Sequence, residues 1–160
     1  MTRPEVGAAA PDFSLPATDD QTLSLADFRG RNVVLYFYPK DSTPGCTNES
    51  QAFRDRIKAF RDADTVVLGI SRDSVRSHEN FRRKQALPFD LVSDPDEVAC
   101  RAYDVITEKN MYGRQVRGIE RSTFLIDAGG LLRREWRRVK VDGHADEVLA
   151  AARELAAGAA

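Results

Sequence analysis

Apolar residues along this chain gather in three continuous runs that are typical of buried strands. Residues 32–38 and 65–70 are rich in β-branched and aromatic side chains without polar alternation, which indicates strands buried on both faces. Ser122–Ile126 is a third such run, and the turn-forming residues 127–130 predict a hairpin into an antiparallel strand over residues 131–141. A short strand is expected at residues 91–92.

Helical spacing lies between these strands. Phe53, Ile57 and Phe60 stand at i, i+4 and i+7, which predicts an amphipathic helix after the first strand. Asp73 and Ser74 are candidate caps of a helix that reaches about residue 86. Two further helices are predicted, one over residues 95–103 with a proline and acidic residues in its first turn, and one over residues 145–155.

The order of these elements predicts an α/β protein with a mixed central sheet flanked by helices on both faces. The first two strands would run parallel, joined by a right-handed helical crossover. This is the plan of a thioredoxin-like fold, although the pattern alone leaves other three-layer α/β arrangements open. With no linker or repeat, the 160 residues are interpreted as a single domain over 1–160.

Composition removes several functional classes. The chain is 42% hydrophobic and 31% charged, as expected of a folded protein, and its net charge of −1 gives no basic excess for nucleic-acid binding. No apolar run approaches the roughly 20 residues of a membrane helix, and the N-terminal residues do not resemble a signal peptide. We therefore expect no membrane partner and a cytoplasmic, reducing location.

Two cysteines, Cys46 and Cys100, are too few for a disulfide scaffold and, with two histidines, for a four-ligand zinc site. Cys46 follows a turn-forming loop at the point where a helix should begin. Unpaired N–H groups and the partial positive charge of a helix start favour the thiolate, which is the reactive form. Thr43 offers a nearby hydroxyl and Glu49 can hold an arginine, so a reactive thiol is favoured over an inert buried one.

The segment YFYPKDSTPGCTNES, residues 36–50, contains Pro39-x-x-x-Thr43-x-x-Cys46 and resembles the signature of the peroxiredoxins. Together with GIERSTFLID at residues 118–127 it resembles their bacterioferritin comigratory protein (PrxQ) subfamily. Shorter motifs, from PDFSL at residue 11 to KVDGHA at residue 140, extend the resemblance over nearly the whole chain.

The resemblance implies a thiol-dependent peroxidase for hydrogen peroxide and organic hydroperoxides that needs no metal or other cofactor. Cys46 would attack the peroxide and become a sulfenic acid, and Thr43 would hydrogen-bond the peroxide. Arg121 would lie beside the sulfur and stabilise charge on the leaving oxygen. Pro39 would shield the site from water, and Glu49 would orient an arginine through a charge-assisted pair.

The sequence departs from the subfamily at the two usual positions of a second, resolving cysteine, which are Gln51 and Arg82 here. Cys100 is interpreted as a core residue in preference to an unusual resolving cysteine. A one-cysteine cycle would follow, in which thioredoxin, glutaredoxin or glutathione attacks the sulfenic acid. The resemblance to the subfamily also implies a monomer. The alternatives are a two-cysteine cycle through Cys100, and a thioredoxin-fold binding or chaperone-like module that does not turn over.

Four other features are assigned on weaker patterns. His78 is expected on an exposed helix face, and His144 as a cap or surface residue, with a Cys–His pair to Cys46 left open. Residues 108–112 are expected to form a polar loop, either ordinary and exposed or walling the site with Met111 or Tyr112. Residues 133–138 are interpreted as a solvated strand with Arg–Trp stacking, with docking of a reductant protein as a weaker hypothesis.

Overall fold

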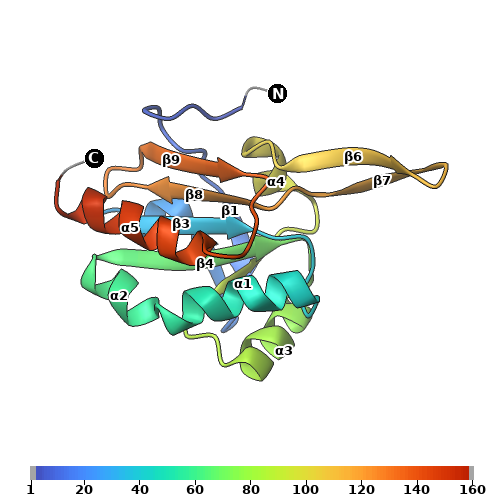
Figure 1. Cartoon of the computed structure of the whole chain (residues 1–160), viewed down its shortest axis with the longest axis horizontal. Helices are drawn as coiled ribbons and strands as arrows, with labels where there is room; N and C mark the ends of the chain where they lie inside the picture. Colours follow the sequence, from blue (N-terminus) through green and yellow to red (C-terminus); the bar gives the residue numbers. More distant parts are fainter. Residues whose placement is uncertain (1–2, 159–160) are drawn as a thin grey trace.

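The computed structural model describes residues 3–158, which are built around a seven-stranded sheet of order β2-β1-β5-β4-β3-β8-β9 (Figure 1). Its centre is the parallel pair of β3 (Asn32–Phe37) and β4 (Thr65–Ser71), which the apolar runs predict. Every residue of β3 is buried, as expected of a strand with side chains packed on both faces.

Further strands extend the sheet on both sides. β5 (Leu91–Ser93) pairs in parallel with β4, whereas β8 (Ser122–Ile126) and β9 (Leu132–Arg137) continue antiparallel from β3. β9 is shorter than the predicted strand over residues 131–141. Two strands that the sequence analysis did not assign, β1 (Ser14–Ala17) and β2 (Gln21–Ser24), form a hairpin beside β5.

One face of the sheet is covered by α1 (Pro44–Asp55), α2 (Ile57–Asp62), α3 (Val75–Gln85) and α5 (His144–Ala156) (Figure 1). The single helix predicted from Phe53, Ile57 and Phe60 is therefore two helices. They are separated at Arg56, which has φ −112° and ψ 9° and whose guanidinium binds the Ala52 carbonyl and Asp146 on α5. Among residues 3–158, no helix has the length and apolar character needed to cross a membrane.

The other face is covered by the N-terminal segment, the short 3₁₀ helix η1 (Leu25–Phe28) and α4 (Val98–Ala102). The prediction of a helix over residues 95–103 was wrong in its start, because Glu97 has a left-handed φ of 60°. The Asp94 carboxylate instead accepts the N–H groups of Val98 and Cys100. Val98 is exposed rather than part of the apolar side.

Residues 108–112 belong to a β-hairpin, so the prediction of a polar loop was wrong. β6 (Ile106–Met111) and β7 (Arg114–Ile119) form a separate two-stranded arm that projects from the body of the protein (Figure 1). Tyr112 and Gly113 make its turn with positive φ angles of 52° and 78°. Tyr112 is 99% exposed at the tip. A hairpin exposed on most positions lacks the apolar alternation that identifies strands in a sequence.

Successive side chains of β3 point to opposite faces of the sheet and so belong to two different hydrophobic cores. Val33, Leu35 and Phe37 point into the cluster that contains Cys100, whereas the residues between them point into the cluster that contains Cys46. The sheet therefore lies between the two thiols.

Gly69 on β4 is predicted to be intolerant of a side chain, because an added Cβ would lie 2.8 Å from both Tyr36 and Leu91. Gly69→Ala should lower the free energy of unfolding by about 2 kcal/mol, as overpacking does in a dense core. Gly118→Ala is the matched control on β7, where an added Cβ meets no atom within 4 Å. Denaturant titration measures both, and equal losses would contradict the packing argument.

Candidate active site around Cys46

Cys46 lies in the first turn of α1 and is completely buried. Thr43 is the N-cap residue with an extended backbone, Pro44 is the first helical residue, and the first helical bond runs from Thr47 N to the Thr43 carbonyl at 2.9 Å. Proline suits this position because its fixed φ fits a helix start and its missing N–H has no intrahelical partner to lose. The sulfur is thereby held where the unpaired N–H groups of the helix converge.

Arg121 joins Cys46 to Glu49. Its Nη2 donates to Cys46 Sγ at 3.3 Å and its Nη1 donates to Glu49 Oε1 at 2.6 Å. The sheet explains this meeting, since Ser122 pairs with Phe37 and so places Arg121 at the end of β3 from which the Cys46 loop departs. The structure thus places Arg121 beside the sulfur and Glu49 on the arginine, the arrangement that the resemblance implied.

Burial and pairing oppose each other at this ion pair. Glu49 is 1% exposed, and burial raises its pKa to about 7 although Arg121 lowers it. Burial lowers the pKa of Arg121, but Glu49 and Cys46 together raise it by more than burial lowers it, so the pKa rises overall. The guanidinium therefore stays positive next to the sulfur, where a cation favours the thiolate.

Gly45 leaves the room that this guanidinium occupies. A Cβ added at Gly45 would lie 3.2 Å from Arg121 Nη2, which is closer than most side-chain contacts allow. The absence of a side chain one residue before Cys46 is thus part of the site's geometry.

The two other predicted site residues lie near this centre without contacting the sulfur in the recorded hydrogen bonds. Thr43 is half-buried, and its hydroxyl donates to the Lys40 carbonyl at 2.8 Å. Pro39 lies two residues after the end of β3 and is exposed. Their roles towards a peroxide stay predictions.

A cavity of about 710 Å³ opens on the outer side of Arg121, at the base of the β6–β7 arm. Its lining includes charged side chains of both signs, with Glu120 and Arg138 forming an ion pair at 3.1 Å. The cavity offers a small polar molecule space beside the guanidinium. Thr107 and Lys109, from the arm that the sequence analysis interpreted in part as a loop, also line it.

Cys100 has the surroundings of a structural thiol. It is completely buried, as expected of a core cysteine, and its backbone N–H donates to Asp94 at 2.8 Å. Burial and the neighbouring Asp94 carboxylate raise the pKa of the Cys100 thiol far above its usual range. The thiol therefore stays protonated, and the sheet separates it from Cys46.

Polar contacts fill the two positions at which a resolving cysteine was sought. Gln51 on α1 donates to Gln85 on α3 at 2.8 Å. Arg82 on α3 pairs with Asp19 at 2.8 Å and donates to the Leu87 carbonyl. Both side chains anchor α1 or α3 to neighbouring segments.

His144 is the first residue of α5 and is 4% exposed, so its interpretation as a cap or surface residue was wrong. Its Nε2 makes a 2.8 Å hydrogen bond with the Thr123 hydroxyl. Burial lowers the pKa of His144 to about 4. The charge of Glu147 opposes this shift, whereas the charge of Arg121 adds to it. The imidazole is neutral at pH 7, and its recorded hydrogen bond goes to Thr123 and not to Cys46.

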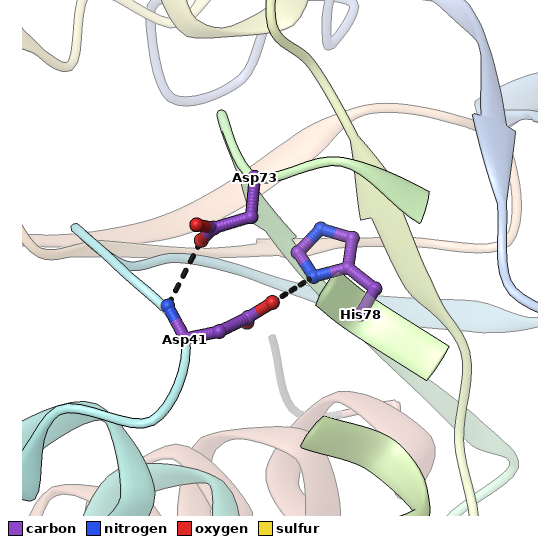
Figure 2. Close-up of side chains that lie close together, drawn as sticks. All are labelled: Asp41, Asp73 and His78. Atoms are coloured by element: carbon purple, nitrogen blue, oxygen red, sulfur yellow. Dashed lines mark hydrogen bonds and ion pairs between the residues drawn. The ribbon is translucent and has the colours of Figure 1, made fainter. Parts of the chain in front are cut away.

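The prediction of an exposed His78 was also wrong, since this side chain is completely buried. It belongs to a hydrogen-bonded group with Asp41 and Asp73, which Figure 2 shows. Phe81, three residues later and also buried, marks the same helical face, and this spacing was the available signal. The three residues could offer ligands to a metal ion, but the 2.7 Å between His78 Nδ1 and Asp41 Oδ2 is a hydrogen-bond distance.

The interpretation of residues 133–138 is partly confirmed. The Arg134 guanidinium lies 4.9 Å from the centre of the Trp136 ring, which is the predicted stacking. Arg137 instead turns inwards, over Phe124 and onto the carbonyls of Tyr103 and Asp104.

Comparison with known proteins identifies relatives of the whole chain. Residues 6–135 match the model of the AhpC/TSA family. A putative peroxiredoxin bcp of Coxiella burnetii is 52% identical over 91% of this chain and 96% of its own length. Peroxiredoxin Bcp of Xanthomonas campestris is 54% identical over 92% of each chain.

Solved structures agree with these relatives. The bacterioferritin comigratory protein of Xanthomonas campestris, described as having alkyl peroxide reduction activity, superimposes with a TM-score of 0.90 at 50% identity, covering 95% of this chain and 99% of its own. A mutant of Xylella fastidiosa PrxQ gives 0.90 at 43% identity over the whole of both chains. The predicted thioredoxin-like α/β fold is thereby confirmed.

The two-pronged contact of Arg121 predicts that lysine cannot replace it. Arg121→Lys keeps the charge but offers one nitrogen to two partners, and the loss of one charged hydrogen bond corresponds to about a tenfold change in an equilibrium. The ultraviolet absorbance of the Cys46 thiolate should then develop at higher pH. Arg138→Lys, at a neighbouring and 88% exposed arginine, is the control. Identical titrations of the two variants would remove Arg121 from this role.

Because the pKa of the buried His144 is lowered in the folded state, we expect the protein to lose stability in mild acid. The folded state holds its pKa near 4, below the usual 6.5, so the unfolded state takes up the proton first as the pH falls. The contribution of His144 to the free energy of unfolding is complete above pH 6.5 and declines down to pH 4, by about 3 kcal/mol at most. His144→Gln keeps a donor for Thr123 without this titration. Denaturant unfolding at several pH values should show a smaller acid loss in the variant, and parallel curves would contradict it.

Proposed function

The chain belongs to the AhpC/TSA family as a peroxiredoxin of the PrxQ type, hence a thiol-dependent peroxidase, and on this premise we propose that Cys46 is its peroxidatic cysteine. The observation that carries the proposal is the 3.3 Å contact between Arg121 Nη2 and Cys46 Sγ. It combines a helix N-terminus with a permanent cation at one sulfur, and both favour the thiolate.

In the proposed reaction the Cys46 thiolate attacks one oxygen of the peroxide. A sulfur–oxygen bond forms, the oxygen–oxygen bond breaks, and the leaving oxygen takes a proton to become water or an alcohol. Cys46 is thereby oxidised to a sulfenic acid. Arg121 supports this step because its charge lies where the negative leaving oxygen develops.

We assign positioning and shielding to the remaining predicted residues. Glu49 orients Arg121 through the 2.6 Å ion pair. The Thr43 hydroxyl, three residues before the sulfur, hydrogen-bonds the bound peroxide in exchange for its present partner, the Lys40 carbonyl. Pro39 limits the access of water to the loop that carries Thr43 and Cys46.

We propose that an external thiol completes the cycle. Its sulfur attacks the sulfenic acid, releasing water and forming a mixed disulfide, and a second thiol then restores Cys46. The protonated Cys100 on the far side of the sheet supports this over an internal disulfide, which needs Cα atoms within about 7 Å. Thioredoxin, glutaredoxin and glutathione are the candidate reductants, and a reducing cytoplasm would supply them.

Access to the sulfur suggests which part of α1 moves. Because Cys46 is completely buried, a thiol larger than a peroxide reaches it only when the first turn of α1 opens. The second half of α1 is tied to α3 through Gln51, whose amide binds Gln85, and through Arg54, which donates to the Gln85 carbonyl. We therefore propose that opening is confined to the first turn.

The substrate range and assembly follow as further proposals. The alkyl peroxide reduction of the Xanthomonas campestris protein supports organic hydroperoxides as substrates beside hydrogen peroxide. We propose that the chain acts as a monomer whose 160 residues form one domain.

Peroxide consumption and intact mass together test the proposal. We expect Cys46→Ser to abolish peroxide consumption with a thiol reductant, since it removes the nucleophile. After one equivalent of peroxide without reductant, the unmodified protein and Cys100→Ser should both gain one oxygen, in agreement with a one-cysteine cycle.

Two outcomes would contradict these assignments. Equal consumption by Cys46→Ser and the unmodified protein would show that the thiol is not turned over, as in a binding or chaperone-like module. A loss of two hydrogens in the unmodified protein that disappears in Cys100→Ser would establish a two-cysteine cycle through Cys100.

A further inference from the structure

A second buried polar group lies beside the loop that leads to Cys46. The carboxylate of Asp41 accepts three hydrogen bonds: from the Tyr38 hydroxyl at 2.6 Å, from the Ser77 hydroxyl at 2.8 Å and from His78 Nδ1 at 2.7 Å. The Asp41 backbone N–H donates to Asp73 Oδ2 at 2.9 Å, as Figure 2 shows. The residue after β3, helix α3 and the turn before α3 thus all hold one aspartate.

The contacts of His78 require a proton between its ring and Asp41. His78 Nε2 lies 2.9 Å from the Val92 carbonyl, which can only accept, so Nε2 carries hydrogen. Nδ1 faces Asp41 Oδ2, and the Tyr38 hydroxyl nearby already donates to Asp41 Oδ1. A neutral imidazole beside an ionised carboxylate cannot satisfy both ring contacts, because one nitrogen would meet an acceptor without hydrogen.

The surroundings keep this proton in place. The side chains of His78 and Asp41 are 0% and 3% exposed, so water does not replace the bond. Burial holds the pKa of Tyr38 well above its usual value, so its hydroxyl stays a donor. The Asp73 carboxylate also lies beside the pair, and it accepts hydrogen bonds from Asp41 N and from the Ser71 hydroxyl.

The loop between Asp41 and Cys46 has a restricted backbone, so the position of Asp41 determines where α1 begins. Ser42 has a left-handed φ of 64°, a backbone conformation that a residue with a side chain adopts only when its neighbours are fixed. Asp41 is fixed on one side of it and Thr43, the N-cap of α1, on the other through the Lys40 carbonyl. Only four residues therefore separate Asp41 from Cys46, with little freedom between them.

We propose that Asp41 and His78 form a proton-bridged positioning pair that holds the turn before α1 and thereby keeps Cys46 against Arg121. The inference rests on the proposed role of Cys46. The pair does not touch the peroxide. It fixes the backbone that places the sulfur, and a sulfur displaced by about 1 Å loses much of its reactivity.

The test is the second-order rate constant for oxidation of Cys46 by hydrogen peroxide, measured from pH 5 to 9 in variants that circular dichroism shows to be folded. Asp41→Asn and His78→Gln should each lower it by about tenfold, because both lose the bridge. His78→Asn, whose amide can stand in for Nδ1, should recover most of the rate. Ser77→Ala, which removes one bond to Asp41, is a milder variant expected to fold if the others do not and to lower the rate about threefold.

Rescue by His78→Asn and comparison with a second buried carboxylate separate positioning from mere stability. Asp94→Asn is the matched control, since Asp94 is an equally buried carboxylate that binds the backbone of α4. It should reduce thermal stability and leave the rate constant unchanged.

Each contrary result has a defined meaning. Normal rates in folded Asp41→Asn and Ser77→Ala, equal losses in Asp94→Asn, or a rate in His78→Asn as low as in His78→Gln would each overturn the positioning pair. Cys46→Ser is measured alongside. If it still consumes peroxide, the proposed role of Cys46 fails, whereas an inactive Cys46→Ser with normal Asp41→Asn overturns the positioning pair alone.

Discussion

The site depends on one half-buried arginine that serves two acidic partners at once. The side chain of Arg121 is 16% exposed and divides its fork between Glu49, at 2.6 Å, and the sulfur of Cys46, at 3.3 Å. Withdrawing a guanidinium from water is costly unless its donors are satisfied. The antiparallel pairing of β8 with β3, the position of Glu49 one turn beyond Cys46, and the missing side chain of Gly45 all provide for that satisfaction.

The sheet that delivers the arginine also separates the two thiols. Because successive residues of β3 point to opposite faces, the cysteine after β3 and the cysteine of α4 are buried in different cores. Cys46 meets a cation and a helix start, whereas Cys100 meets an apolar cluster and the carboxylate of Asp94. Burial alone does not make a thiol inert, and the charge beside it decides the chemistry.

The sequence predicted the parts of the structure that rest on local pattern. The continuous apolar runs of β3, β4 and β8 identified the central strands, and the residues around Cys46, with the resemblance they carry, identified Arg121 and Glu49 as its partners. What it missed depends on partners distant in the chain. The β6–β7 arm is polar on its exposed positions and pairs only with itself, and the 3.6-residue pattern around His78 gave no sign of Asp41, which is 37 positions earlier.

The same long-range partners explain why the loop before α1 is polar in a protein that could have buried apolar residues there. An apolar residue at Asp41 would bury well, but it could not accept the Tyr38, Ser77 and His78 hydrogens together, and the left-handed Ser42 would lose its fixed neighbour. Buried polar networks are directional, whereas hydrophobic contacts tolerate sliding. Two such networks, Arg121 with Glu49 after the sulfur and Asp41 with His78 before it, therefore define the position of one atom, Cys46 Sγ, from both ends of the segment that carries it.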